Sequence, residues 1–408
     1  MKHAAAIIGR SSNRSFKPDQ LAGAGLQYIL KAACAKARLL RAALLFIAAM
    51  TQPVVFCGCS DMSTALRNKL EQAVDTAMAK YKIPGAIVGV WSPKSGDLVM
   101  LKGKADIKTG ADMKSADRVR ICSITKTFTV TVLLELVDEG KLSLHDTLAK
   151  FYPDIPNADR ITIQQLCNMT AGIFNYSEDE TFLKTYTEDP NKVWTPREQV
   201  DLAVAHRPYF PPGEGWHYSN TNTIILGMII QQLTGNDVGS EIQSRLVDVL
   251  KLNSTYYPEG TGIEGAHVHG YLGGEGEELT DGTYLFNPSG MGASGALISN
   301  LHDLKTWVIS LANGDLLEKD TQAQRTTFVP GDYDYFGITV KYGLGIMSSE
   351  GFLGHPGDGL GYTNAAFHSP ETGTTIVVFL NKSPNADSYM ALTLFTELAK
   401  IMNAEDSK

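Results

Sequence analysis

Cysteine is scarce in this sequence: the 408 residues contain only five, and three of them lie close to the N-terminus. The rest of the chain keeps Cys122 and Cys167 alone. A fold held together by a disulfide framework is therefore excluded, although these two residues could form one bridge. Cys122 directly precedes a candidate nucleophile, and we interpret it as a small packed residue.

The sequence also lacks the residue patterns that bind metals or dinucleotides. No Cys/His group has metal-ligand spacing, and His267 and His269 alternate as on a strand or loop. The segment Gly290–Gly295 satisfies the glycine pattern of dinucleotide-binding folds. No buried parallel strand precedes it, so a tight glycine turn is the better interpretation. We expect no cofactor and no metal ion.

Clusters of Lys and Arg are missing from most of the chain. Residues 1–41 hold eight Lys or Arg against one acidic residue, which gives this segment a formal charge of +7. Because the whole chain carries −8, the remainder carries −15. An acidic body without a basic patch argues against nucleic acid as a partner.

Long apolar runs are missing as well, since the apolar segment Ala42–Met50 is too short to span a bilayer as a mature helix. It follows three basic residues and precedes Gly58-Cys59. Residues 1–59 therefore resemble a leader with an export signal, in which Cys59 is the lipidated residue of a bacterial lipoprotein box. Plain secretory cleavage, an uncleaved anchor and a later translation start remain alternatives. We expect an exported protein of the bacterial cell envelope whose membrane contact is this N-terminal anchor only.

The sequence does contain a single Ser-x-x-Lys motif, Ser123 to Lys126, at the start of an apolar helical run that ends before Gly140. On a helix these two residues share a face, so the lysine can lie beside the serine hydroxyl. A buried lysine has a lowered pKa and can accept the serine proton. The backbone N–H of Ser123, at the helix start, is free to bind an oxyanion. A helix-capping serine and a surface lysine are the alternative.

Two further motifs follow along the chain. The first is Tyr218-Ser219-Asn220 and the second is His355-Pro356-Gly357. The separations are 95 residues from Ser123 to Tyr218 and 137 from Tyr218 to His355. With these motifs the chain resembles the serine penicillin-recognising enzymes, the group of class C β-lactamases, DD-carboxypeptidases and related esterases, which carry Ser-x-x-Lys, Tyr-x-Asn and a Lys/His-x-Gly strand in this order. The resemblance extends from about residue 66 to the C-terminus.

The resemblance implies acyl transfer through a covalent ester on Ser123. Lys126 would accept or polarise the serine proton, and Tyr218 takes the position of the family's shared acid and base. Asn220 would bind the amide carbonyl of the substrate and help to orient Lys126. The partner would be a small-molecule or peptide acyl substrate, such as a peptidoglycan peptide, a β-lactam or an ester.

The third motif both matches the family pattern and departs from it. His355 stands where the family has Lys or His, and Asp358, which follows Gly357, would bind the oxyanion through its backbone N–H. Pro356 replaces the usual Thr or Ser, whose hydroxyl meets the substrate carboxylate, and proline has no donor. The side chain of Asp358 brings negative charge to the same place. A D-Ala-D-Ala substrate is therefore less well supported than the acyl-enzyme.

Periodicity predicts an α/β architecture. The expected elements are a helix over 66–82, a hairpin of strands 86–91 and 97–102, a helical region over about 127–260, strands at 342–347 and 374–380, and a closing helix over about 386–402. This order agrees with the β-lactamase-like α/β fold, an antiparallel sheet sandwiched by helices with an all-α lobe. We expect one hydrolase domain over 60–408, with an α/β lobe at about 64–126 and 290–408, a helical lobe at about 127–289, and the active site between them.

Three functions remain open from the sequence. The resemblance favours a DD-carboxypeptidase or β-lactamase-like hydrolase of carboxylated amides. Pro356 and Asp358 favour an esterase or amidase for neutral acyl substrates. A β-lactam-binding sensor would need acylation without turnover, and the set of Ser123, Lys126 and Tyr218 argues against it.

Overall fold

The computed structural model describes residues 62–274, 278–331, 338–383 and 389–408. Residues Cys59–Lys408 form one compact unit. The leader expected over residues 1–59, with its lipidation site at Cys59, lies outside the described residues. None of the helices in the described ranges combines the length and the apolar composition that crossing a membrane requires.

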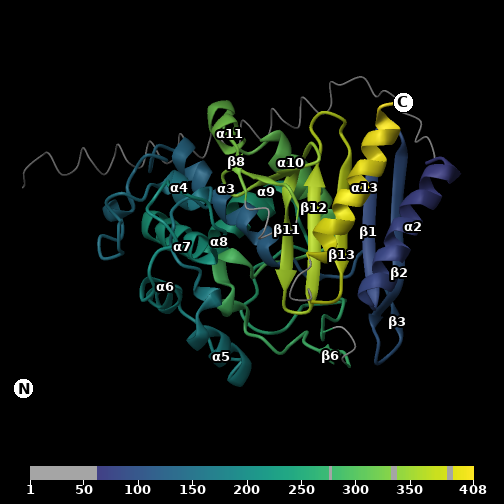
Figure 1. The fold of residues 1–408 in the computed structure, drawn as a ribbon, viewed down its shortest axis with the longest axis horizontal. Helices are drawn as coiled ribbons and strands as arrows, with labels where there is room; N and C mark the ends of the chain where they lie inside the picture. Colours follow the sequence, from purple (N-terminus) through teal and green to yellow (C-terminus); the bar gives the residue numbers. More distant parts are fainter. Residues whose placement is uncertain (1–61, 275–277, 332–337, 384–388) are drawn as a thin grey trace, which may run out of the picture. The chain divides into compact units, whose positions relative to one another are not determined.

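A nine-stranded antiparallel sheet forms the centre of this unit, in the order β3-β2-β1-β13-β12-β11-β10-β9-β8 (Figure 1). Its strands are β1 (Gly85–Ser92), β2 (Gly96–Asp106), β3 (Ala111–Asp112), β8 (Val329–Pro330), β9 (Lys341–Tyr342), β10 (Met347–Ser349), β11 (Phe352–Gly359), β12 (Tyr362–His368) and β13 (Thr375–Leu380). β1 and β13 are apolar and buried along almost their whole length because both faces of the sheet are covered there. β2, nearer the edge, alternates between buried and exposed residues.

Helices cover both faces of the sheet, and others gather beside it (Figure 1). They are α2 (Thr64–Tyr81), α3 (Thr125–Asp138), α4 (Ile163–Cys167), α5 (Glu180–Glu188), α6 (Pro196–Val204), α7 (Asn220–Thr234), α8 (Val238–Ile242), α9 (Asp248–Leu250), α10 (Leu301–Asn313), α11 (Lys319–Arg325) and α13 (Met390–Asp406). α13 packs on β12 and β13 together with α2, while α10 contacts the same strands from the other side. α3 contacts both β11 and α7, so it joins the sheet to the helical group.

The two faces of the sheet bury different cores because neighbouring side chains of a strand point to opposite sides. Val88, Ala365 and Val378 pack in the core that includes α2 and α13. Ile87 and Val377 pack in the second core, which continues into α3, α7 and α10. The strand that carries the third motif therefore has one face toward α3, and this face borders the predicted active site.

The predicted architecture, an antiparallel sheet covered by helices, is confirmed, and so are the first helix and the hairpin, as α2, β1 and β2. The single strand predicted over 342–347 is wrong, because β9 ends at Tyr342 and β10 begins at Met347. Gly345 between them has a φ of 63°, and Gly343 donates to the carbonyl of Ile346, so the apolar run contains a turn. The closing helix α13 ends at Asp406, four residues beyond the predicted end.

Candidate active site

Ser123 lies in η1 (Cys122–Ile124), a short helical turn that runs directly into α3. Lys126 Nζ donates a hydrogen bond of 2.9 Å to Ser123 Oγ, as expected for residues one helical turn apart. Ser123 is partly exposed, whereas Cys122 and Ile124 are buried. The structure thus brings the predicted nucleophile and its predicted base into contact and leaves the hydroxyl within reach of a ligand.

Lys126 is completely buried, and this burial lowers the pKa of its amine well below the usual range. A neutral amine at this position can accept the Ser123 proton. The carbonyl of Ser294 accepts a second hydrogen bond of 2.9 Å from Lys126 Nζ. Ser294 ends η6 (Gly292–Ser294), and Thr129 on α3 donates to the neighbouring Ala293 carbonyl at 2.7 Å. The Gly290–Gly295 segment therefore positions the lysine.

Tyr218 and Asn220 reach the same place from the start of α7. The Tyr218 ring is nearly buried, and its centroid lies 4.8 Å from Lys126 Nζ. Asn220 Nδ2 donates to Ser177 Oγ at 3.0 Å, while its buried Oδ1 has no hydrogen-bond partner among the described residues. The Ser294 carbonyl contributes to the orientation of Lys126, and the role expected of Asn220 stays a prediction. The Asn220 oxygen is an acceptor, so a water molecule or a donor group of a substrate can satisfy it.

Strand β11 carries the third motif along the Ser123 turn. A Cβ atom at Gly357 would lie 2.2 Å from the Ile121 carbonyl oxygen and 3.2 Å from the Ile124 nitrogen. Only glycine lets the strand pass this close to the nucleophile. β10 pairs with β11 only as far as Gly354, so beyond it one edge of β11 has no strand partner in the described part of the chain. A substrate can lie along this edge.

His355 faces the site as a buried, neutral side chain. Burial is the main cause that lowers the pKa of His355, to about 3. Its Nδ1 donates to the Pro356 carbonyl at 2.5 Å, so the other ring nitrogen, Nε2, accepts from the Tyr342 hydroxyl at 2.9 Å. The ring centroids of His355 and Tyr218 are 6.1 Å apart. Tyr342 was missed in the sequence because nothing in its spacing connects it with the motifs.

Asp358 follows Gly357 and is partly exposed as a residue. Its Oδ1 atom is buried and has no hydrogen-bond partner among the described residues. Burial raises the pKa of this carboxyl well above its usual range. Burial raises the pKa of the Cys122 thiol. Cys122 Sγ donates to the Gly359 carbonyl at 3.2 Å, so the residue after Asp358 contacts the residue before the nucleophile. The negative charge expected at Asp358 is therefore costly unless a cation accompanies it.

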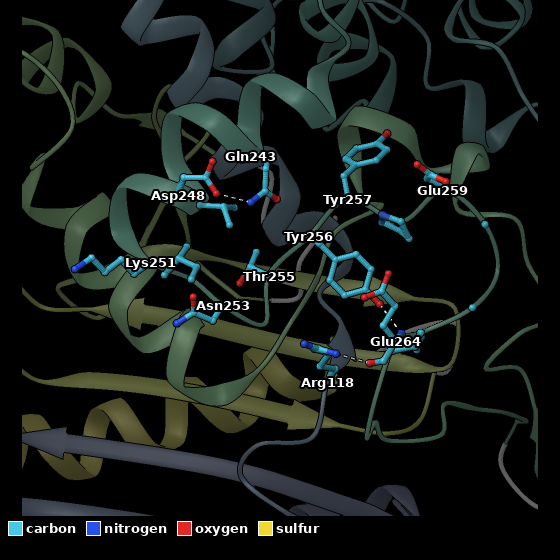
Figure 2. Close-up of a pocket in the computed structure, with 16 residues that line it drawn as sticks. Arg118, Gln243, Asp248, Lys251, Asn253, Thr255, Tyr256, Tyr257, Glu259 and Glu264 are labelled. Atoms are coloured by element: carbon cyan, nitrogen blue, oxygen red, sulfur yellow. Dashed lines mark hydrogen bonds between the residues drawn. The ribbon is translucent and has the colours of Figure 1, made fainter. Parts of the chain in front are cut away.

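A surface hollow of about 860 Å³ is lined by a different set of residues, part of which Figure 2 labels. None of the motif residues lines it. Its polar groups largely engage one another: Arg118 donates to the Glu264 carbonyl at 2.6 Å, and Gln243 donates to the Asp248 carboxylate at 2.7 Å. The hollow is therefore not a candidate for the catalytic chemistry.

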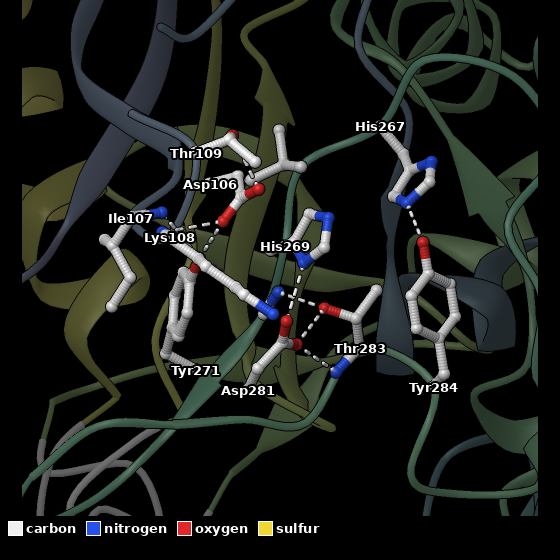
Figure 3. Close-up of polar contacts among 12 residues, drawn as sticks. Asp106, Ile107, Lys108, Thr109, His267, His269, Tyr271, Asp281, Thr283 and Tyr284 are labelled. Atoms are coloured by element: carbon white, nitrogen blue, oxygen red, sulfur yellow. Dashed lines mark hydrogen bonds and ion pairs between the residues drawn. The ribbon is translucent and has the colours of Figure 1, made fainter. Parts of the chain in front are cut away.

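His267 and His269 lie on a loop, with ring centroids 5.4 Å apart (Figure 3). His267 contacts the Gly265 carbonyl at 2.7 Å and the Tyr284 hydroxyl, whereas His269 pairs with Asp281 at 2.7 Å. In the described ranges, no three His, Cys, Asp or Glu side chains are placed to bind one metal ion. Each histidine thus stabilises the loop through a different partner.

Comparisons with known proteins agree with this geometry. The Beta-lactamase family model matches residues 70–399. A D-aminopeptidase of Cereibacter sphaeroides is 24% identical over an alignment of 330 residues, which covers 78% of this chain and 60% of that protein. A penicillin-binding protein of Bacillus subtilis (strain 168) is 23% identical over 80% of this chain and 74% of its own length.

Among solved structures, a D-stereospecific amidohydrolase from Streptomyces sp. is 32% identical, with a TM-score of 0.68. The match covers 77% of this chain and 94% of that chain. The chain spans only about 60% of the length of the D-aminopeptidase, so the whole activity of that protein does not transfer directly. Because the family model covers most of the chain and Lys126 contacts Ser123 directly, this protein belongs to the Beta-lactamase family and is a serine hydrolase.

Proposed function

We propose that this protein hydrolyses amide bonds of D-amino acid derivatives, such as D-amino acid amides or short peptides that begin with a D-residue. The observation that carries the proposal is the hydrogen bond between the Lys126 amine and Ser123 Oγ, because a buried, neutral lysine can take the serine proton. The preference for D-residues is supported by the names of the relatives, the D-stereospecific amidohydrolase above all.

The proposed reaction has two halves. Lys126 takes the proton of Ser123 as Oγ attacks the amide carbon, and the N–H groups of Ser123 and Asp358 bind the developing oxyanion. Tyr218 returns a proton to the leaving amine as the C–N bond breaks, which leaves an ester on Ser123. Water then adds to the ester carbonyl and gives up its proton to the same basic groups. The carboxylic acid product departs, and Ser123 regains its hydrogen.

Two alternatives differ in the substrate. A DD-carboxypeptidase must bind a substrate carboxylate, and Pro356 offers no donor for it. An esterase for neutral acyl groups needs neither that donor nor a charged partner, and the same strand supports this second candidate. We expect the amide of a D-amino acid to be a better substrate than its L-isomer and than a D-Ala-D-Ala peptide.

A substrate panel tests the proposal. It compares a D-amino acid amide, the L-amide, a D-Ala-D-Ala peptide, a chromogenic cephalosporin and a short-chain aryl ester, with Ser123→Ala as the control for contaminating activity. Hydrolysis of the D-amide above the L-amide supports the proposal. Turnover of the aryl ester alone would support the esterase instead, and efficient release of D-Ala from the peptide would restore the carboxypeptidase.

We also propose that the protein is exported and lipid-anchored at Cys59, because the residues before this cysteine resemble a lipoprotein signal. Expression in a bacterial host with a labelled fatty acid should give a labelled membrane protein, and Cys59→Ser should abolish the label. Unlabelled protein released in processed form would indicate plain secretory cleavage.

A further inference from the structure

The free edge of β11 contains one polar side chain with an unusual environment, that of Asp358. Gly357, the residue before it, lies against the backbone on both sides of Ser123. The Cys122 thiol donates to the carbonyl of Gly359, the residue after Asp358, at 3.2 Å. Asp358 therefore lies on β11 between two residues that contact the turn carrying Ser123.

Within the part of the chain that the structure describes, the Asp358 carboxyl has no partner of opposite charge. No salt bridge within the described residues includes it, and its Oδ1 is buried without a hydrogen bond. An unpaired buried carboxyl is destabilising, and natural sites retain such a group where a ligand satisfies it. The raised pKa of Asp358 has the same cause, because burial without a partner favours the protonated, uncharged carboxyl.

Two features of β11 indicate that a ligand group bound beside Asp358 carries positive charge. Pro356 removes a backbone donor, so the strand cannot offer that N–H to an anion. Asp358 adds an acceptor that becomes favourable only beside a cation. Burial lowers the pKa of Lys126 and so favours its neutral form, which weakens its repulsion of a second cation. The strand thus rejects a carboxylate and accepts an ammonium group.

We propose that the Asp358 carboxylate binds the free α-ammonium group of an aminoacyl substrate and so selects substrates with an unblocked N-terminus. The inference rests on the proposed function, since it specifies which D-amino acid derivatives the site accepts. An α-ammonium is only two bonds from the carbonyl carbon. A substrate whose carbonyl oxygen is bound by the Asp358 N–H therefore places its ammonium within reach of the same residue's side chain. N-acylated and desamino substrates lack this contact.

The experiment uses matched aryl esters, so that it does not depend on amide hydrolysis. The native protein and Asp358→Asn are assayed at about pH 7 with the p-nitrophenyl esters of D-alanine, N-acetyl-D-alanine and propionic acid, where the free amine of D-alanine is mostly protonated. We expect the ratio of kcat/KM for the free-amine ester to that for the N-acetyl ester to fall at least about tenfold in Asp358→Asn, as for a lost charged hydrogen bond. Hydrolysis of the propionyl ester, which has no amine, measures how far the substitution disturbs the oxyanion site itself, and the other two esters are compared with it.

Two controls separate this role from a structural one. Asp97→Asn removes the same charge from an exposed position on β2, and it should leave the ratio unchanged. Activity on the propionyl ester shows that the Asp358→Asn site is still assembled. An equal loss on all three esters, or an unchanged ratio, overturns the inference. If the ratio falls as expected while no D-amide is hydrolysed in the panel, the proposed function fails and the amine recognition stands.

Discussion

The two sides of the catalytic site differ in how their polar groups are satisfied. On the helix side, Lys126 has two hydrogen-bond partners, Ser123 Oγ and the Ser294 carbonyl. On the strand side, formed by His355 to Asp358 of β11, the histidine is fully engaged but the Asp358 Oδ1 has no partner in the described residues. Groups whose hydrogen bonds are complete can act on any acyl substrate. A group without a hydrogen-bond partner favours a substrate that supplies the missing partner.

Burial acts on both sides but moves the two ionisable groups in opposite directions. It lowers the pKa of Lys126 and raises the pKa of Asp358, so each group is driven toward its uncharged form. For Lys126 the uncharged form is the reactive one, since it can accept a proton. For Asp358 the charged form becomes favourable only when a cation binds beside the carboxylate. We therefore expect the helix side to carry out the acyl transfer and the strand side to determine which substrates are accepted.

The largest effect is expected from the helix side, on Ser123. We expect Ser123→Ala to lower kcat by about five to six orders of magnitude, because the covalent intermediate can no longer form. A fluorescent penicillin or a fluorophosphonate, followed by peptide mass mapping, should place the adduct of the native protein on Ser123. Ser95→Ala, on the hairpin between β1 and β2, is the matched control and should label normally. An adduct on another serine would exclude the mechanism.

Lys126→Ala and Tyr218→Phe should each lower kcat by about two to four orders of magnitude, the scale of lost general acid–base catalysis. Their joint effect should be far smaller than the product of the two, because both residues act on one proton path. Steady-state kinetics on one aryl ester measures all three variants. Full activity in Tyr218→Phe would mean that the Tyr-Ser-Asn match is accidental.

The helix side was also the more predictable from sequence, because its central contact is local. Ser123 and Lys126 are one helical turn apart, so the motif alone determines that they meet. The Ser294 carbonyl and the Tyr342 hydroxyl come from segments far along the chain, and no spacing rule brings them to the site. The strand predicted over 342–347 failed for a related reason, since an apolar run does not reveal a glycine turn inside it.

On the strand side, we expect two substitutions together to produce a gain of function. Pro356→Thr combined with Asp358→Thr should raise kcat/KM for a D-Ala-D-Ala peptide at least about tenfold, because the changes restore two hydroxyl donors and remove a repulsive charge. Release of D-Ala from the peptide measures this effect. The same variant should lose its preference for free-amine esters. If the native protein already cleaves the peptide efficiently, other residues bind the carboxylate and the selective role of the strand side is lost.

The smallest expected effects are on stability. Between its lowered pKa in the folded state and its ordinary value of 10.5, Lys126 binds a proton only in the unfolded chain, so the free energy of unfolding rises with pH across this window. Asp358 behaves oppositely. Between 3.8 and its raised folded pKa, the folded protein binds a proton that the unfolded chain does not, so stability falls as pH rises.

At neutral pH both groups therefore destabilise the fold, and replacing either with an uncharged side chain should stabilise it. We expect Lys126→Met and Asp358→Asn each to raise the free energy of unfolding by about 1–2 kcal/mol, the usual gain when a strained functional residue is removed. Urea unfolding at about pH 5, 7 and 9 distinguishes the two sides. In Lys126→Met the free energy of unfolding should rise less as the pH increases, and in Asp358→Asn it should fall less as the pH increases from low values. Lys319→Met, at an exposed position on α11, is the control and should change neither slope. If Asp358→Asn destabilises the protein instead, the carboxyl has a structural partner, and the contrast between a complete helix side and an incomplete strand side does not hold.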